Sequence, residues 1–343
     1  MTPPAILITG ANGEIGQSLI EQLSARSPET PLLALDLKSP VDAIADKVTL
    51  AIQADVAADR TSYERAVADY EVGTIYHLAA LLSTAAERDP ERAQRVNVDG
   101  TFALLSMAAR LGGKRGQAVK FVFPSSIAAY GVKDKQELGA TPVCEDEHLQ
   151  PVTMYGINKL YCEQLGLYYA THDQKTQQPP TIRVDFRCVR LPGVISAHTL
   201  PTGGTSDYAP EMIHAAAQGK TYASFVRPDT TIPFMVMPDA VNALLQLADA
   251  PREHLTRYVY NVNGFSLSAA AFAERVQSYF PAATITFAPD KNRQRIVDSW
   301  PANVDDSQAL RDWGWRPQYD VQAAFEDYLV PAIVARYAST KKL

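Results

Sequence analysis

Short apolar runs alternate with longer amphipathic stretches along the first half of the chain. The apolar runs, typical of strands buried on both faces, span Ala5–Thr9, Leu32–Asp36, Val48–Ala51, Thr74–Leu78, Val119–Phe123 and Asp185–Arg190. Helical periodicity between them covers Glu14–Arg26, Tyr63–Asp69, Pro90–Leu111 and Thr153–Thr171. Strands that alternate with helices in this way form a parallel sheet covered on both faces. We therefore expect a doubly wound α/β domain.

The pattern changes after about residue 195. Later residues predict helices at Pro210–Gly219 and Asp239–Ala250, and strands at Pro233–Met237 and Tyr258–Asn261. We expect residues 1–195 to form the first domain, with 233–262 returning to it. Residues 196–232 and 263–343 then form a smaller C-terminal α/β domain. The polar stretch His172–Thr181 is expected to be an exposed loop.

Composition narrows the class of protein. The 343 residues are 46% hydrophobic and 20% charged, which is ordinary globular usage. A net charge of −6 with scattered Lys and Arg argues against nucleic acid and anionic membranes as partners. No long apolar run or leader is evident, so we expect a cytoplasmic protein. The three cysteines and six histidines are too sparsely spaced to predict a metal site.

A glycine-rich turn follows the first expected strand and opens the first expected helix. Gly10, Gly13 and Gly16 leave room for a pyrophosphate against the backbone at a helix N-terminus. Asp36 ends the second expected strand, where a carboxylate binds both hydroxyls of an adenosine ribose and repels a 2′-phosphate. This arrangement favours NAD over NADP in a Rossmann-type fold, although a solvated carboxylate at a strand end has the same pattern. Asp55 suits either an adenine contact or a helix N-cap.

A second group of residues carries acid–base chemistry. Tyr155 and Lys159 are four residues apart, so they share one helix face. A tyrosine acting as base at neutral pH needs its pKa lowered by roughly 2–3 units, which a neighbouring ammonium and the positive nicotinamide ring can supply. Ser125 and Ser126 follow a strand, at the edge where open α/β sheets bind ligands. Each motif by itself also has a structural explanation. Tyr155 and Lys159 are typical of an aromatic ring stacked on a lysine side chain, and Ser125 and Ser126 are typical of residues that cap a turn.

With these motifs in this order, the chain resembles the extended short-chain dehydrogenase/reductases, or NAD-dependent epimerase/dehydratases, over nearly its whole length. The family's catalytic Ser or Thr lies four residues before the Tyr of a Tyr-Gly pair, here Tyr130-Gly131. The resemblance therefore implies Ser126, Tyr155 and Lys159 as catalytic residues. It implies an NAD site formed by Gly10, Asn12, Gly13, Glu14, Ile15, Gly16, Asp36, Asp55, Val56, Leu78, Ala79, Ala80, Asn97, Tyr155, Lys159, Leu191 and Pro192. It also implies a homodimer formed through Pro90–Leu111 and Thr153–Thr171.

Within this family, the second half resembles the short-chain type of L-threonine 3-dehydrogenase. The matching segments are 185–188, 192–196, 203–209, 298–301, 305–307 and 312–315. The resemblance implies that a loop closes over the substrate and that the substrate site contains Ser83, Ser126, Tyr155, Gly204, Thr205, Ser206 and Trp300. The family loop usually reads Gly-Gly-Thr-Thr, so Ser206 keeps the hydroxyl but lacks a methyl. Turn formation by Thr205 and Ser206, and packing between domains by Trp300, are the alternative roles.

The function implied is NAD-dependent oxidation of the β-hydroxyl of L-threonine, or of a close small hydroxy acid, to 2-amino-3-oxobutanoate by hydride transfer. Two alternatives stay open. A nucleotide-sugar 4-epimerase or dehydratase of the same fold would need a basic pair for a second pyrophosphate, and none is identifiable in the sequence. A non-catalytic NAD-binding sensor would have no need of Ser126, Tyr155 and Lys159.

Overall fold

The computed structural model describes residues 3–176, 182–201 and 203–340. Seven parallel strands of these residues form the main sheet, in the order β10-β6-β5-β4-β1-β2-β3. They are β1 (Ala5–Thr9), β2 (Leu32–Asp36), β3 (Leu50–Gln53), β4 (Val72–His77), β5 (Val119–Ser126), β6 (Val184–Leu191) and β10 (Val259–Asn261). The order reverses at β1, which pairs with β2 on one side and β4 on the other. Open parallel sheets bind ligands in the crevice at the carboxyl ends of the strands, at such a reversal.

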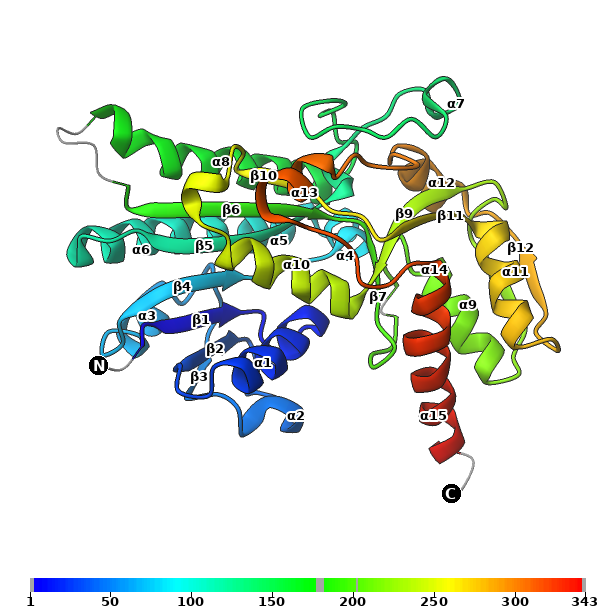
Figure 1. Ribbon diagram of the computed structural model, residues 1–343, viewed down its shortest axis with the longest axis horizontal. Helices are drawn as coiled ribbons and strands as arrows, with labels where there is room; N and C mark the ends of the chain where they lie inside the picture. The colour runs from blue at the N-terminus through cyan, green and yellow to red at the C-terminus, as the bar shows by residue number, and fades with distance from the viewer. Residues whose placement is uncertain (1–2, 177–181, 202, 341–343) are drawn as a thin grey trace.

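Helices cover both faces of this sheet (Figure 1). One face carries α3 (Arg60–Ala66), α4 (Ser83–Arg88), α5 (Pro90–Ala93), the π-helical turn η1 (Gln94–Asp99), α6 (Gly100–Arg115) and α8 (Met154–Thr176). The other carries α1 (Glu14–Arg26), α2 (Asp42–Ala45) and α10 (Met237–Asp249). Because neighbouring side chains of a strand point to opposite faces, Leu7 joins the core under α6 and α8, while Ile8 joins the core under α1 and α10. The predicted doubly wound α/β fold is confirmed.

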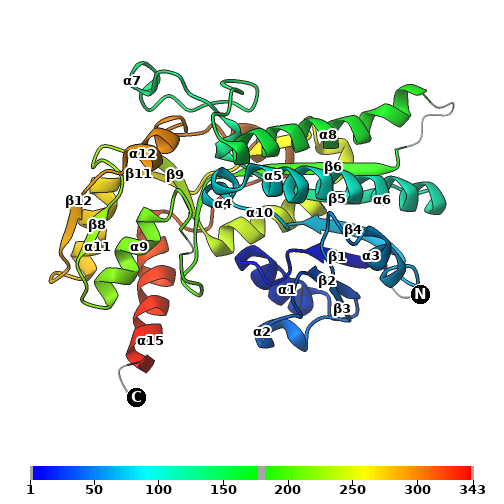
Figure 2. The same cartoon turned by 180° about the vertical axis from the view of Figure 1, so that it is seen from behind.

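Smaller sheets lie at the other end of the molecule from the N-terminus (Figures 1 and 2). In the described part of the chain, one contains β7 (Gly193–Ile195), β9 (Thr231–Val236) and β11 (Phe265–Ser268), and another contains β8 (Tyr222–Ser224) and β12 (Ile285–Phe287). The helices of this region are α9 (Tyr208–Ala217), α11 (Ala269–Tyr279), α12 (Lys291–Asp298), α14 (Val321–Ala323), η4 (Ala324–Leu329) and α15 (Val330–Thr340). The remaining short helices are η2 (Ile127–Ala129), α7 (Lys135–Leu138), η3 (Arg252–His254) and α13 (Ser307–Trp313).

Several predicted elements differ in position or partner. The strand expected at Pro233–Met237 is β9, which pairs with β7 and β11 rather than with the main sheet. The chain rejoins the main domain only with α10, whose apolar face packs on β5 and β6, and with β10, which pairs with β6. Residues 172–176 extend α8 instead of forming a loop, and residues 177–181 of that expected loop lie outside the described residues.

No helix in the described ranges is both long enough and apolar enough to cross a membrane.

Candidate active site

Steric limits at two glycines shape the turn between β1 and α1. Gly10 has a φ of +67°, and a Cβ there would stand 2.7 Å from the backbone nitrogen of Ala79. A Cβ at Gly16 would collide with the carbonyl oxygen of Gly10. The backbone therefore closely approaches the segment after β4 and leaves the start of α1 free of bulky side chains. A pyrophosphate fits this cradle because the helix N-terminus carries partial positive charge.

Two adjoining cavities follow the carboxyl edge of the sheet from this turn. The larger has a volume of about 310 Å³ and the smaller about 250 Å³. Gly10, Gly13, Leu78 and Ala80 line both, so the cavities form one extended groove. A dinucleotide needs a groove of this form, with one nucleoside on each side of the pyrophosphate.

The smaller cavity has the features of an adenosine site. Asp36, Asp55, Val56 and Ala79 all line it. The Asp36 carboxylate stands at the end of β2 and accepts the Asn12 N–H at 3.0 Å. Asp55 also accepts the Ala57 N–H at 2.8 Å, so its carboxylate shapes the local turn while it faces the cavity. A carboxylate placed as Asp36 is suits two ribose hydroxyls.

Two residues expected at the cofactor line neither cavity. The Asn12 amide donates to the carbonyls of Lys38 and Ser39 and accepts the Val41 N–H, which fixes the loop after β2. Asn97 is buried in η1 and exchanges two hydrogen bonds, of 2.7 and 3.1 Å, with the backbone of Leu81. Both asparagines therefore hold backbone segments behind the groove.

Ser126, Tyr155 and Lys159 line the larger cavity together. Ser126 ends β5, and Tyr155 and Lys159 lie in the first two turns of α8. The buried Lys159 ammonium donates to the carbonyl of Pro124 at 2.6 Å and lies 5.6 Å from the centre of the Tyr155 ring. The expected catalytic residues thus converge from two elements on one space.

The pKa of Tyr155 departs from the prediction. Burial raises the pKa of its phenol above the ordinary value, and the hydrogen bond with Ser126 opposes this only in part. Burial also lowers the pKa of Lys159 to about 8. In the protein alone, burial therefore outweighs the lowering that the sequence analysis expected from Lys159. The reason is that the phenolate would lose its water, while the ammonium is directed at the Pro124 carbonyl.

Ser125 has a different environment from Ser126. Its hydroxyl donates to Glu163, one turn beyond Lys159 on α8. Glu163 in turn forms two hydrogen bonds, of 2.9 and 2.6 Å, with Arg190 of β6, and this ion pair is buried. The network fixes the end of β5 against α8, and it engages Ser125 while Ser126 bonds to Tyr155.

The expected substrate residues form another part of the same cavity. Ser83, Gly204, Thr205, Ser206 and Trp300 all line it, as do Leu191 and Pro192 and the residues Glu14, Ile15 and Gly16 of the glycine turn. The hydroxyls of Ser83 and Thr205 lie 3.0 Å apart, which joins α4 to the loop after β7. The loop is also a tight turn, because Asp207 accepts the N–H groups of Gly203 and Gly204. Turn formation and cavity lining therefore coexist in this loop.

The sequence analysis missed several cavity residues. They include Ser196, Thr199, Asp207 and Met237 in the larger cavity, and Leu37, Arg92 and Val96 in the smaller one. Leu37, Ser196 and Met237 directly follow strands, and that position was a usable signal. Arg92 and Thr199 follow no strand, so only the folded chain places them. Within the described ranges, no group of three His, Cys, Asp or Glu residues is placed to hold a metal ion.

A glycine cradle at a helix N-terminus, a carboxylate at the end of β2 and a Ser-Tyr-Lys cluster are together typical of dinucleotide-dependent enzymes. Comparison with known proteins agrees. Residues 6–263 match the model of the NAD dependent epimerase/dehydratase family. The chain belongs to this family.

Comparison with individual proteins shows which members of the family this chain is similar to. L-threonine 3-dehydrogenase, mitochondrial, of Sus scrofa is 34% identical over 319 residues, which are 93% of this chain and 80% of that protein. An uncharacterized epimerase/dehydratase of Staphylococcus saprophyticus is 35% identical over 322 residues, 93% of each chain. The X-ray structure of L-threonine dehydrogenase from Clostridium difficile superposes with a TM-score of 0.85 at 33% identity, covering 98% of this chain and 99% of that one. The chain is thus similar to NAD-dependent dehydrogenases of this family.

Proposed function

We propose that this enzyme oxidises the β-hydroxyl of L-threonine, or of a close small hydroxy acid, to the ketone, which for L-threonine is 2-amino-3-oxobutanoate. One observation carries the proposal. Ser126, Tyr155 and Lys159 line the same cavity as Ser83, Thr205 and Trp300, and that cavity continues into the dinucleotide groove. The similarity to L-threonine 3-dehydrogenases supports the same substrate.

The size of the cavity favours a small substrate. About 310 Å³ must hold the nicotinamide end of the cofactor as well as the reacting alcohol. This is near the lower end of the range for ligand pockets, so it suits a hydroxy amino acid better than a nucleotide-sugar. The polar hydroxyls of Ser83, Thr205 and Ser206 suit the charged groups of such a substrate.

The chain's own residues divide the proton chemistry between them. When bound, NAD+ accepts the hydride that leaves the β-carbon. Tyr155, as phenolate, takes the proton of the β-hydroxyl, and Ser126 donates a hydrogen bond to the same oxygen. With NAD+ bound, the Lys159 ammonium would stabilise the phenolate together with the positive nicotinamide ring, and Lys159 would also hold the ribose. Asp36 selects NAD over NADP by repelling a 2′-phosphate.

The test is NADH formation from NAD+ with L-threonine, L-allo-threonine, L-serine, 3-hydroxybutyrate and UDP-glucose, with NADP+ in parallel. Turnover of L-threonine with NAD+ is expected. Activity on another hydroxy acid alone would change the proposed substrate but leave the proposed reaction unchanged. Because an epimerase makes no net NADH, the UDP-glucose sample is also analysed for a sugar isomer, whose formation would contradict the proposal.

We also propose that two copies pair through α6 and α8. Ile157, Tyr161 and Tyr168 lie on one face of α8 and are about half exposed, and Phe102 of the adjacent α6 is similarly exposed. Exposed apolar side chains on two neighbouring helices suit an interface in which a two-fold axis brings the same surface of two copies together. Sedimentation of the wild type and of Tyr161→Glu should give a dimer and a monomer, whereas a monomeric wild type would contradict the proposal.

A further inference from the structure

One helix of the smaller domain is connected to two parts of the substrate cavity. The guanidinium of Arg293, near the start of α12, donates to the carbonyl oxygen of Gly204 at 2.6 Å. Trp300 follows the end of the same helix by two residues. Gly204 and Trp300 both line the larger cavity. The helix α12 therefore joins the substrate loop to the Trp300 segment.

Arg293 is held in place independently of the loop. Asp290 caps α12 by accepting the N–H groups of Asn292 and Arg293 at 3.0 and 2.9 Å. The Arg293 guanidinium stacks on the ring of Phe225, which is itself buried. A stacked and planar guanidinium has lost much of its rotamer freedom, so each hydrogen bond it makes costs less entropy than one from a lysine.

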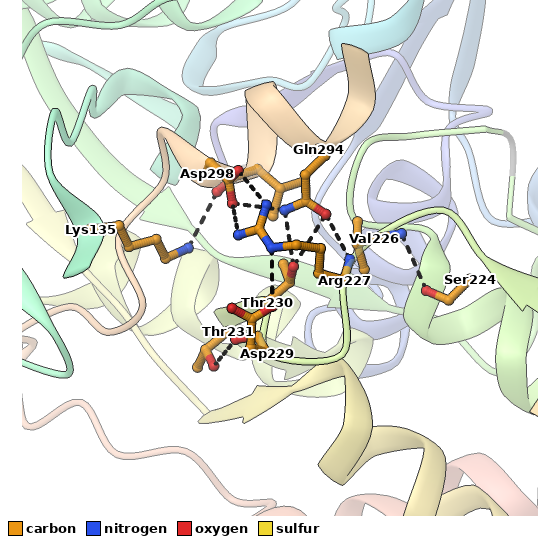
Figure 3. A network of polar contacts seen from close by, with 10 residues as sticks. Lys135, Ser224, Val226, Arg227, Asp229, Thr230, Thr231, Gln294 and Asp298 are labelled. Carbon is orange, nitrogen blue, oxygen red and sulfur yellow. Dashed lines mark hydrogen bonds and ion pairs between the residues drawn. The ribbon is translucent and has the colours of Figure 1, made fainter. Parts of the chain in front are cut away.

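The other end of α12 is fixed by a polar network (Figure 3). Asp298 accepts two hydrogen bonds of 2.9 Å each from the guanidinium of Arg227, which is the bidentate geometry. Gln294 accepts the Arg227 N–H at 2.7 Å and donates to Asp298 at 2.7 Å and to Thr230 at 3.0 Å. These contacts hold α12 on the segment before β9, so the spacing between Arg293 and Trp300 is set.

The substrate loop is bound from the main domain as well. Thr84 donates to the carbonyl of Gly203 at 2.6 Å, and Ser83 bonds to Thr205 at 3.0 Å. The successive carbonyls of Gly203 and Gly204 are thus bound by opposite domains, one from α4 and one from α12. A Cβ on Gly204 would stand 2.8 Å from the Asp207 carboxylate, so a larger residue at this position would displace that side chain.

We propose that Arg293 is a positioning residue that fixes the Gly204 peptide, and with it Thr205, so that α12 sets the width of the substrate cavity between this loop and Trp300. The inference rests on the proposed function, since it takes a small hydroxy amino acid as substrate. Without Arg293 the loop keeps Ser83, Thr84 and Asp207 and loses its tie to the smaller domain. Loss of Arg293 should therefore weaken substrate binding and selection by substrate size, and should leave proton transfer at Tyr155 unchanged.

The kinetic test compares Arg293→Met with Arg295→Met, a matched change at an exposed arginine of the same helix. Removing a charged hydrogen bond should raise the KM for L-threonine about tenfold, with kcat and the KM for NAD+ within about twofold. Selectivity against 2-amino-3-hydroxypentanoate, one methylene larger, should fall several-fold. Arg293→Lys should recover part of the loss, and Arg295→Met should match the wild type. An unchanged KM and unchanged selectivity in Arg293→Met would overturn the proposal.

A second measurement separates this proposal from the proposed function. Amide hydrogen exchange of residues 203–209 in the NAD-bound protein needs no substrate. Exchange should be faster in Arg293→Met than in the wild type or Arg295→Met, and equal exchange would overturn the proposal. If the wild type does not oxidise L-threonine, the proposed function fails and the exchange result still decides the role of Arg293. If Arg293→Met does not fold, Arg293→Gln, which is shorter and uncharged, provides the same comparison.

Discussion

The cofactor half and the substrate half of the groove are built in different ways. The cofactor half uses short segments at the ends of adjacent parallel strands, such as the Gly10–Gly16 turn, Asp36 and the residues after β4. The substrate half gathers Ser83, Thr205 and Trp300 from three separated stretches of chain. The first is held by the hydrogen bonds of one sheet. The second depends on side-chain bonds between domains, such as Ser83 with Thr205 and Arg293 with Gly204.

This difference predicts how each half responds to substitution. Substitutions in the cofactor half collide with rigid backbone, so they should cause large losses of affinity for the dinucleotide. Substitutions in the substrate half alter side-chain contacts that can readjust, so they should cause smaller changes, in the KM for the substrate and in substrate selectivity. The catalytic cluster lies where the two halves meet, and its loss should have the largest effect.

Tyr155→Phe removes the proposed base and keeps the ring. Turnover of L-threonine should fall about 10³-fold, which is within the range for loss of a general base. NAD+ affinity, measured by protection against thermal unfolding, should stay within about twofold. Turnover near the wild-type level would exclude Tyr155 as the base.

Gly16→Ala tests the rigid half. The added Cβ would collide with the Gly10 carbonyl, and such overpacking costs about 1–3 kcal/mol. The affinity for the dinucleotide should therefore fall by roughly 10–100-fold, measured by fluorescence titration with NADH. Gly113→Ala is the control, because a Cβ there comes no closer than 3.6 Å to the Arg183 side chain. Equal affinities in the two variants would refute the steric account of the turn.

Asp36→Ala tests the choice of dinucleotide. Removing the carboxylate from the smaller cavity should lower the ratio of kcat/KM for NAD+ over NADP+ by about tenfold or more, since it removes both ribose bonds and the repulsion of a 2′-phosphate. Asp42→Ala, at an exposed acid in α2, should leave the ratio unchanged. A constant ratio in both variants would show that Asp36 does not read the ribose.

The pH profile tests the coupling of Tyr155 and Lys159. Because burial raises the pKa of Tyr155, the active phenolate is scarce at weakly acid pH, and kcat/KM should increase as pH rises. The increase should level off above a pH of about 8, since the Lys159 pKa is about 8 and its ammonium charge is then lost. In Lys159→Met the levelling near this pH should disappear. A flat kcat/KM from weakly acid to alkaline pH would contradict the assignment of the base.

Ser206→Thr is the mildest change and tests the adjustable half. It adds one methyl where the related loops carry threonine, and burying a methyl contributes about 0.8 kcal/mol. The KM for L-threonine should therefore fall by up to about fourfold, with NAD+ affinity unchanged. A large rise in KM would show that the loop is as rigid as the glycine turn.

Much of the cofactor half was predictable from local pattern. Gly10 and Asp36 were identified from strand ends, and both line the groove. Asn12 and Asn97 were placed at the cofactor by resemblance, and the structure shows them binding backbone behind it. Motif position identifies the neighbourhood of a residue, but the direction of its side chain depends on which backbone groups need a partner.

The partners of the late strands were less predictable. Residues 233–262 were expected to return to the first domain, but β9 within them pairs with β7 and β11 and not with the main sheet. A short apolar strand has the same pattern in any buried sheet, so its sequence does not specify its neighbour. The role of α12 was hidden for a similar reason, because Arg293 lies 89 residues from the carbonyl it binds.

The sequence by itself determined the doubly wound sheet, the glycine turn, the Asp36 position and the Ser-Tyr-Lys order. These follow from local spacing, since strand and helix periods and turn sterics act over a few residues. Only the tertiary structure decided that burial raises the pKa of Tyr155 and that Ser125 pairs with Glu163. It also decided that Thr84 of α4 and Arg293 of α12 bind the carbonyls of Gly203 and Gly204. These depend on desolvation and on contacts between distant segments, which arise only when the chain is folded.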